Sequence, residues 1–422
     1  MARIYYSLYD RMFQKQRLYR AFEKVKSNKG AAGIDGQRVA DFAEHLSEEI
    51  ASLAYELKEK SYRPKPVRRV EIPKPDGGVR ALGIPTVRDR VVQQALLDIL
   101  QPIFDPEFHP SSYGYRPGRS CHQAIAKASL FIRRYRRRWV VDMDLSRCFD
   151  TLSHDLIIQG FRRKVADGSI LGLLRMFLQS GIMADGDWQT SRLGSPQGGV
   201  ISPLIANVYL DAFDQHMKAR GHRIVRYADD ILILSGSKRG AEHAFSVARN
   251  YLEKELRLTV NERKSRIVHS RDGISYLGVI IENRYTRILP DKIGQLKQRV
   301  RSITRRNSPV NLEKVIADLN PLLRGFANYF RVANCRKQFR ELASWIRRRL
   351  RAKQLTMWKK PKRLFRRLRQ LGYEGSPKAI KMNLWRNAAS PLANYAIPNH
   401  WLWELGLFEL SRVETGYLPQ NY

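Results

Sequence analysis

The sequence predicts an α/β (α+β) fold for residues 1–284 and an α-helical fold from about residue 285 onward. In the first part, short runs of β-branched and aromatic residues alternate with stretches whose apolar residues recur every three or four positions. These patterns are typical of strands and helices, respectively. In the second part the helical spacing dominates, and the chain becomes very basic. A chain of 422 residues has room for two or three domains with substantial cores.

The first elements are a helix and a hairpin. Leu18, Phe22 and Val25 have helical spacing, and the glycine-rich stretch 28–36 that follows is a turn. It is not a phosphate-binding loop, because no Gly-Lys-Ser/Thr follows it. Residues 68–82 then predict two short strands around a Pro-Asp-Gly-Gly turn. The basic side chains of this hairpin either meet a triphosphate or face solvent, and the pattern alone leaves both open.

Three further helices follow in the first part. One begins at Asp89, as N-cap, and ends before Pro102. A polar, glycine-dense loop at 194–199 leads into a second helix, which Ser202 and Pro203 open. The glycines of that loop allow close approach to a ligand, which Gln197 can contact. A third helix is expected over 241–256, and a strand over 274–279.

Two adjacent aspartates interrupt the most apolar strand of the sequence. Asp229 and Asp230 lie within residues 224–234, which are otherwise mostly apolar. An unpaired charge facing a core costs several kcal/mol, so either the chain turns at the aspartates or a cation neutralises them. Mg²⁺ suits such a place, because it takes hard oxygen ligands and binds through one or two carboxylates plus substrate phosphates. Taken alone, however, Asp-Asp is also common in ordinary turns.

A second strand carries a similar anomaly. Residues 139–150 place Asp142 and Asp144 on one face of an apolar strand. Two such strands can pool three carboxylates around a pair of metal ions, which is the arrangement for in-line displacement at phosphorus. The alternative is two solvated strand ends, which we consider the lesser possibility for both segments together.

The charge of the chain predicts a nucleic acid as its partner. There are 76 Lys and Arg residues against 40 Asp and Glu residues, for a net charge of +36. Such an excess gives a strong positive field over the surface. We expect no membrane association, because the sequence has no apolar run of about 18 residues and no signal-peptide core at its start. Three cysteines without paired spacing exclude a disulfide framework and a four-cysteine zinc site, and predict a reduced, intracellular protein.

The helical part contains one packing face and one basic run. Apolar residues from Leu312 to Phe330 recur at three and four positions and form one helix face. From Arg347 to Arg369, twelve of 23 residues are Lys or Arg and none is acidic. A run of one sign with interleaved aromatic residues is more typical of phosphate binding with stacking than of a solvated face.

The order of these blocks resembles reverse transcriptases, and in particular those encoded by group II introns. The resemblance extends over essentially the whole chain, and the Ser-Pro-Gln-Gly-Gly and Tyr-Gly-Tyr-Arg-Pro forms favour the group II lineage over retroviral, retron and diversity-generating relatives. The seven blocks are Lys29–Gly36, Ile72–Gly78 with Gly83–Thr86, Ser112–Pro117, Asp144–Asp150, Gly194–Pro203, Tyr227–Asp230 and Tyr276–Gly278.

The resemblance implies a right-hand polymerase with fingers, an antiparallel palm sheet and a helical thumb. Residues 1–284 would form the N-terminal extension, fingers and palm, and residues 285–375 the thumb, which is called domain X in group II maturases. Residues 376–422 would be a basic and aromatic segment, a candidate for DNA binding. No Cys-pair and His/Asn nuclease signature follows the thumb, which is similar to the compact bacterial class C type without an endonuclease.

The resemblance also implies roles for individual residues. Asp144 is preferred to Asp142 as a metal ligand, because the family's gate aromatic lies five positions after the catalytic aspartate, here Phe149. Asp144, Asp229 and Asp230 would be the catalytic residues and would bind two Mg²⁺ ions, which Mn²⁺ can replace. The expected nucleotide contacts are Lys74 and Arg80 to the triphosphate, Gln197 to the sugar and backbone, and Phe149 against a 2′-hydroxyl. The expected primer and template contacts are Tyr227, Arg347, Arg348 and Arg349.

The implied activity is RNA-directed DNA polymerisation from dNTPs, on an RNA template with a DNA primer. A second role as a maturase would bind intron RNA and assist splicing and mobility, in the bacterial cytoplasm and in association with the nucleoid. Three alternatives remain: a non-catalytic RNA-binding splicing factor, an RNA-dependent RNA polymerase, and a domesticated reverse transcriptase in repair or defence. Three intact acids argue against the first, and Phe149 at the gate position argues against the second.

Overall fold

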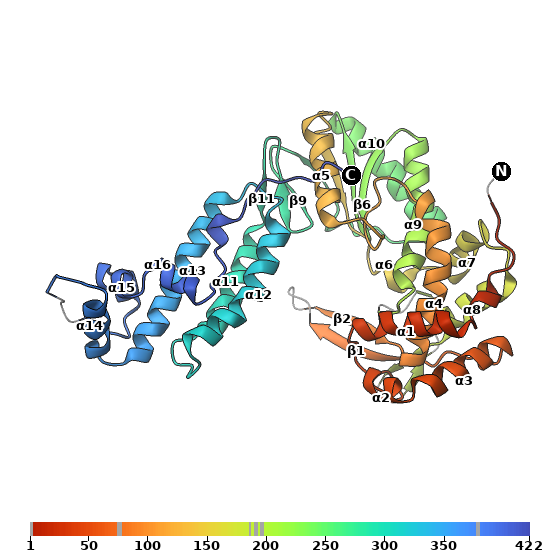
Figure 1. The fold of residues 1–422 in the computed structure, drawn as a ribbon. Coiled ribbons are helices and arrows are strands. Elements are labelled where there is room, and N and C mark those ends of the chain that lie inside the picture. Colours follow the sequence, from red (N-terminus) through yellow and green to blue (C-terminus); the bar gives the residue numbers. More distant parts are fainter. Residues whose placement is uncertain (1–2, 74–77, 185–186, 190–192, 195–197, 377–379) are drawn as a thin grey trace. The chain divides into compact units, whose positions relative to one another are not determined.

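The computed structural model describes residues 3–73, 78–184, 187–189, 193–194, 198–376 and 380–422. The chain divides into two compact units, which are described separately below. The first unit comprises residues 1–269 together with Tyr422, and the second comprises residues 270–421. Figure 1 labels the helices and some of the strands of both.

The first unit begins with three helices, of which α1 packs against α4 and α3 packs against α1. It also contains a sheet that carries the predicted hairpin. Strands β1 (Val67–Pro73) and β2 (Val79–Ile84) are antiparallel, with Ile72 opposite Arg80. The sheet order is β2-β1-β4-β5, in which β4 (Ile182–Ala184) runs parallel to β1. The remaining elements are α1 (Lys15–Ser27), α2 (Val39–Glu44), α3 (Leu46–Lys58), α4 (Val87–Phe104) and β5 (Asp187–Gln189).

A second sheet lies at the centre of this unit. Its order is β6-β7-β3-β8, and all of its neighbouring strands are antiparallel. The strands are short and β-branched, and β7 is buried at its four central positions, which explains why the acidic residues sit at strand ends. The strands are β3 (Trp139–Met143), β6 (Arg223–Tyr227), β7 (Asp230–Ser235) and β8 (Arg266–His269). The helices that contact this sheet are α5 (Cys121–Arg133), α9 (Ser202–Ala219) and α10 (Lys238–Asn250).

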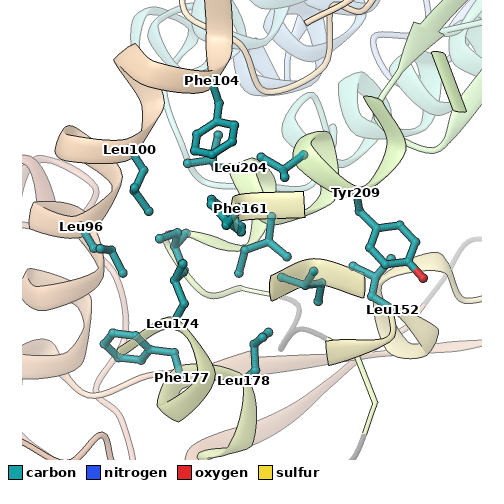
Figure 2. Close-up of a cluster of buried hydrophobic side chains, with 14 of the residues drawn as sticks. Leu96, Leu100, Phe104, Leu152, Phe161, Leu174, Phe177, Leu178, Leu204 and Tyr209 are labelled. Carbon is teal, nitrogen blue, oxygen red and sulfur yellow. The ribbon is translucent and has the colours of Figure 1, made fainter. Parts of the chain in front are cut away.

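The core of the unit joins α4 to the helices that follow β3. Figure 2 shows side chains of α4, α7 (His154–Arg162), α8 (Gly168–Gln179) and α9 directed into one cluster. The rings of Phe104 and Phe161 meet edge to face, with centroids 5.0 Å apart. Each fully buried aromatic or leucine side chain contributes about 1.5–3 kcal/mol to stability. This shared core fixes α9 against α7, and α9 in turn contacts β6.

The second unit consists of a small sheet and a set of helices. β9 (Ile274–Tyr276), β10 (Val279–Ile281) and β11 (Thr286–Ile288) form an antiparallel meander. The predicted apolar face over 312–330 is α12 (Leu312–Phe330), whose Leu319 and Leu323 are fully buried. The other helices are α11 (Pro290–Ile303), α13 (Arg336–Trp358), α14 (Pro361–Gln370), α15 (Pro391–Ala396) and α16 (Asn399–Glu404).

Several predicted boundaries differ from the structure. The N-cap of α4 is Thr86, whose hydroxyl accepts from the backbone N–H of Asp89, and the helix continues through Pro102 to Phe104. Pro102 lies in the last turn of the helix, where it removes one N–H donor. The helix expected over 241–256 is α10, which ends at Asn250 and is followed by a π-helical turn over 251–255. The single strand expected over 274–279 is replaced by two strands, β9 and β10.

The two compact units meet between residues 269 and 270, and the described strands β9–β11 pair with one another in a sheet of their own. The predicted limit between palm and thumb at residues 284 and 285 therefore falls within the second unit, directly before β11. The described part of the segment 376–422 is not a separate body. Its short helices η4 (Trp385–Ala389) and η5 (Leu410–Arg412) contact α13.

Candidate active site

The two adjacent aspartates lie at the tip of the β6–β7 hairpin. Tyr227 pairs with Asp230, and Ala228 and Asp229 form the two-residue turn between them. Ala228 has a φ of +57°, as the tight hairpin turns that match strand twist require. The chain therefore does turn at the aspartates, which was the first of the two solutions expected for charges in so apolar a segment.

The central sheet brings Asp144 to the same place. Strand β3 lies beside β7, and its last residue, Met143, is paired with Ile231. One further step in this antiparallel register puts Asp144 opposite Asp230. Acids separated by more than eighty residues in the sequence are thus gathered at one end of two hydrogen-bonded strands.

A loop after α10 holds Asp144 through hydrogen bonds with uncharged groups. The amide Nδ2 of Asn261 donates to Asp144 Oδ2 at 3.0 Å, and the Asn261 backbone N–H donates to the Asp144 carbonyl at 2.9 Å. The Asp144 N–H donates to Ser265 Oγ at 3.1 Å. These bonds orient the carboxylate without cancelling its charge. No signal in the sequence predicted this role for residues 261–265.

Asp142 differs from Asp144 in having a cationic partner. Arg266 Nε lies 3.3 Å from Asp142 Oδ2 across the β3–β8 pair. Burial raises the pKa of Asp142 above its ordinary value, and Arg266 opposes that shift. The ion pair already supplies a counter-charge for Asp142, which supports the preference for Asp144 as the metal ligand.

The electrostatics of Asp230 show how concentrated the negative charge is. Burial, followed by the charges of Asp229, Asp144 and Asp142, raises the pKa of Asp230 to about 7. The side chain nevertheless keeps a solvent-exposed surface, so solvent screening reduces the effect of its neighbours. Mutual repulsion of this kind favours a cation, which would restore the charged forms.

The described residues do not form a closed metal cage. Within the ranges that the structure covers, no group of three or more His, Cys, Asp or Glu side chains is arranged to hold an ion. Mg²⁺ is usually bound through one or two carboxylates plus substrate phosphates and waters, so such a cage is not required before substrate binds. The oxygen donors and the raised pKa of Asp230 therefore fit a divalent ion that is completed by a phosphate ligand.

The remaining predicted residues around this end of the sheet are only partly described. Phe149 lies in the short helix α6 (Cys148–Thr151), half-buried, directly after the turn that follows Asp144. Tyr227 ends β6, and burial raises its pKa. Lys74 and Gln197 lie outside the described residues. Arg80 is placed only through its backbone, on β2.

Two glycines anchor the loop that contains Gln197. A Cβ on Gly194 would come within 2.7 Å of the Asp150 carbonyl oxygen, and one on Gly198 within 2.5 Å of the Gly83 carbonyl oxygen. Both have positive φ values, of +87° and +114°. Gly194 therefore approaches the backbone of α6 closely, and Gly198 that of β2. The sequence pattern predicted close approach to a ligand, and these contacts with the protein backbone leave that prediction untested.

The three arginines of the second unit that are expected to contact the template all have partners within that unit. Arg347 forms an ion pair with Glu409 at 2.7 Å, and Arg349 Nε donates to Thr304 Oγ1 at 2.6 Å. Arg348 stacks over the Trp385 ring at 4.4 Å. All three are thus engaged within their own unit. The exposed members of the basic run are instead Lys359, Lys360, Lys362, Arg363, Arg366 and Arg369, of which the last four lie on α14.

Comparison with known proteins agrees with this geometry. Residues 72–281 match the family described as "Reverse transcriptase (RNA-dependent DNA polymerase)", and residues 293–372 match "Group II intron, maturase-specific domain". Protein YkfC of Escherichia coli K12 is 37% identical over 304 residues, which cover 63% of this chain and 80% of that protein. The chain belongs to the group II intron-encoded family of reverse transcriptases and maturases. The fold is that of a reverse transcriptase with a helical C-terminal region.

Other relatives are longer or more distant. The group II intron-encoded protein LtrA of Lactococcus lactis is 29% identical over 365 residues, and the match spans 70% of this chain but only 60% of that protein. Apo telomerase from Candida tropicalis aligns with a TM-score of 0.41 at 13% identity, over 58% of this chain and 60% of that one, and we draw no argument from it.

Among the described residues of this chain, no helix is long and apolar enough to cross a membrane.

Proposed function

We propose that this reverse transcriptase polymerises DNA on an RNA template at the end of the β3–β7 pair, with Asp144, Asp229 and Asp230 as the catalytic carboxylates. The observation that carries the proposal is the strand register, which puts Asp144 beside a hairpin whose turn holds Asp229. A binding module has no need of three acids brought together at such electrostatic cost. A purely RNA-binding splicing factor is therefore the weaker candidate.

The family depends on divalent metal ions, and we propose two Mg²⁺ ions at these acids, which Mn²⁺ can replace. When bound, the ions would neutralise charge on the attacking and leaving oxygens of a nucleotidyl transfer. The part played by the chain is to hold its carboxylates in place: Asn261 orients Asp144, and the hairpin turn presents Asp229. The primer 3′-hydroxyl would attack the α-phosphate of a dNTP and release pyrophosphate.

The nucleotide and primer contacts extend the same proposal. Lys74, Arg80 and Gln197 would bind the incoming dNTP, and Tyr227 would support the primer end next to Asp230. Phe149 follows Asp144 by five residues and is half-buried in α6, which is compatible with a ring packed under the deoxyribose. A ring there would discriminate against the 2′-hydroxyl of ribonucleotides.

The maturase role is proposed for the second unit. The maturase-specific match at 293–372 covers most of α11 and all of α12, α13 and α14, and the exposed lysines and arginines of the basic run lie within it. We infer that this surface binds the phosphates of intron RNA, and that the DNA target and the RNA together account for the net charge of +36. The proposal places the protein with nucleic acid in the bacterial cytoplasm.

The test is primer extension by Asp229→Asn on an RNA template with a DNA primer, dNTPs and Mg²⁺. The substitution removes a ligand charge with little change in volume, so cDNA synthesis should be lost while the melting temperature and RNA binding remain near wild type. Asp155→Asn is the matched control, because Asp155 is 88% exposed and forms only a surface ion pair with Arg175. Near-normal cDNA synthesis by Asp229→Asn would refute the site assignment.

A further inference from the structure

A fully buried arginine lies directly behind the aspartate hairpin. Arg226, on β6, and Asp214, on α9, are both 0% exposed. Arg226 Nε lies 2.9 Å from Asp214 Oδ1, and its Nη2 lies 2.6 Å from Asp214 Oδ2. A two-point contact between a guanidinium and a carboxylate fixes the plane of the arginine as well as its position.

The guanidinium also bonds the turn itself. Arg226 Nη1 donates to the Ala228 carbonyl oxygen at 3.0 Å and to Asn207 Oδ1 at 3.1 Å. Ala228 is the turn residue before Asp229, and its φ of +57° is unfavourable for a residue with a side chain. The bond from Arg226 therefore holds a conformation that the chain would not prefer by itself.

Asn207 extends this support to a second segment. Its Nδ2 donates to the Gly114 carbonyl oxygen at 2.9 Å, and this bond fixes the amide orientation, because Oδ1 must face the guanidinium. Gly114 lies so close to the turn that a Cβ on it would come within 2.3 Å of the Ala228 nitrogen. The backbone of Arg226 also exchanges hydrogen bonds with Ser111 and Tyr113 at 2.9 Å each. The turn is thus held by α9 and by the segment 111–114.

We propose that Arg226 and Asn207 are positioning residues that set the place of Asp229 and Asp230, and so the metal affinity of the site. The inference rests on the proposed function, because it assigns the hairpin aspartates to metal binding. A buried ion pair by itself is weak evidence for stability, since well-packed apolar residues often replace it without loss. The distinguishing feature here is that Arg226, besides its bonds to Asp214, also donates to the Ala228 carbonyl oxygen of the turn and to Asn207 Oδ1.

The experiment measures Mn²⁺ binding to the full chain with template–primer, by the electron paramagnetic resonance signal of the free Mn²⁺ that remains. A parallel assay measures how the rate of primer extension depends on the Mg²⁺ concentration. Arg226→Lys keeps a charge for Asp214 but cannot also reach Asn207 and Ala228 with a planar fork. We expect Mn²⁺ affinity to fall by about 10- to 100-fold, as for other residues that orient metal ligands. The Mg²⁺ concentration for half-maximal rate should rise by a similar factor.

Two further variants separate positioning from stability. The double variant Arg226→Met with Asp214→Leu removes the buried charges together, so its melting temperature should recover relative to Arg226→Lys while its metal affinity stays low. Asn207→Leu leaves the ion pair and the bond to Ala228 intact, and is measured in place of Arg226→Lys if that variant does not fold. Arg88→Lys is the control, since Arg88 pairs with Glu49 and Glu56 on α3.

The results that would overturn the positioning role differ from those that would refute the proposed polymerase activity. Mn²⁺ affinity within about twofold of wild type in the Arg226 variants, or recovery of affinity together with stability in the double variant, would overturn the positioning role. A wild-type chain that binds Mn²⁺ but makes no cDNA would refute the proposed polymerase activity, and the titration would still decide the role of Arg226. A wild-type chain that binds no Mn²⁺ would overturn both.

Discussion

Replacing Gly114 with alanine should displace the aspartate hairpin and greatly reduce polymerisation. A Cβ at this position would lie 2.3 Å from the Ala228 nitrogen, and 3.0 Å from both the Ala228 Cα and the Tyr227 carbonyl carbon. Ordinary van der Waals contact begins near 3.4 Å. The nearest atom must therefore move by about 1 Å, and the atoms in question are backbone atoms of the turn, which cannot rotate away as a flexible side chain would.

The size of the effect follows from this displacement. Misplacing a catalytic group by about 1 Å can cost about 100-fold in rate, which corresponds to roughly 2.7 kcal/mol of transition-state stabilisation. We expect a loss of that order in the single-turnover rate of primer extension at saturating dNTP. Thermal unfolding and RNA binding measured on the same preparation show whether the loss is local to the site.

Gly172→Ala provides the matched control for this prediction. Gly172 lies in the interior of α8, and a Cβ added to it meets nothing within 4 Å. Alanine there should leave the rate unchanged and raise stability by about 0.5–1 kcal/mol, because glycine loses more backbone freedom in a helix. If Gly114→Ala extends primers at the rate of Gly172→Ala, the close approach to Ala228 does not position the hairpin.

Three other outcomes are expected. Phe149→Ala should raise ribonucleotide incorporation far more than it lowers deoxynucleotide use; an unchanged preference together with a lower melting temperature would mean that Phe149 is only a core residue. Replacing Lys362, Arg363 and Arg366 of α14 by Gln should flatten the salt dependence of RNA binding by up to roughly one log–log unit per lost phosphate contact; an unaltered slope would make α14 a solvated surface. Asn261→Leu, which frees Asp144 Oδ2 from its amide partner, should weaken Mn²⁺ binding about 10-fold or more, and an unchanged titration would contradict an orienting role.

The sequence predicted the acidic ends of the central strands well, because the signal was local. An apolar run that contains Asp229 and Asp230 has few structural solutions, and the hairpin that forms is one of those expected. The stripe on α12 was similarly clear, since a single helix face determines it. In both cases the residues of a single element determine the structure. In the hairpin, charged residues conflict with their apolar neighbours, and on α12 the apolar residues agree with helical spacing.

The supporting contacts could not be predicted in this way. Arg226 is one charged residue in the same apolar run, and its partners Asp214 and Asn207 lie on α9, so only the packing of α9 against β6 brings them together. The internal partners of the basic run could not be predicted for the same reason. A uniform charge pattern predicted phosphate contacts at Arg347 and Arg349, but tertiary structure gives them Glu409 and Thr304 as partners. Charge alone does not say which side chains a fold uses internally.

The partners of the acids around the hairpin divide them into two kinds. Asp214 and Asp142 each have an arginine as an ion-pair partner within the first unit. Asp144 is held by an amide, a hydroxyl and backbone groups, which orient a carboxylate but leave its charge in place. Asp230 still senses the charge of Asp229, Asp144 and Asp142, and together with burial this raises its pKa to about 7. The fold therefore gives the supporting acids arginine partners, holds Asp144 with neutral groups, and disfavours the charged form of Asp230 until a cation is present. This is the arrangement expected where a metal ion and a triphosphate bind together.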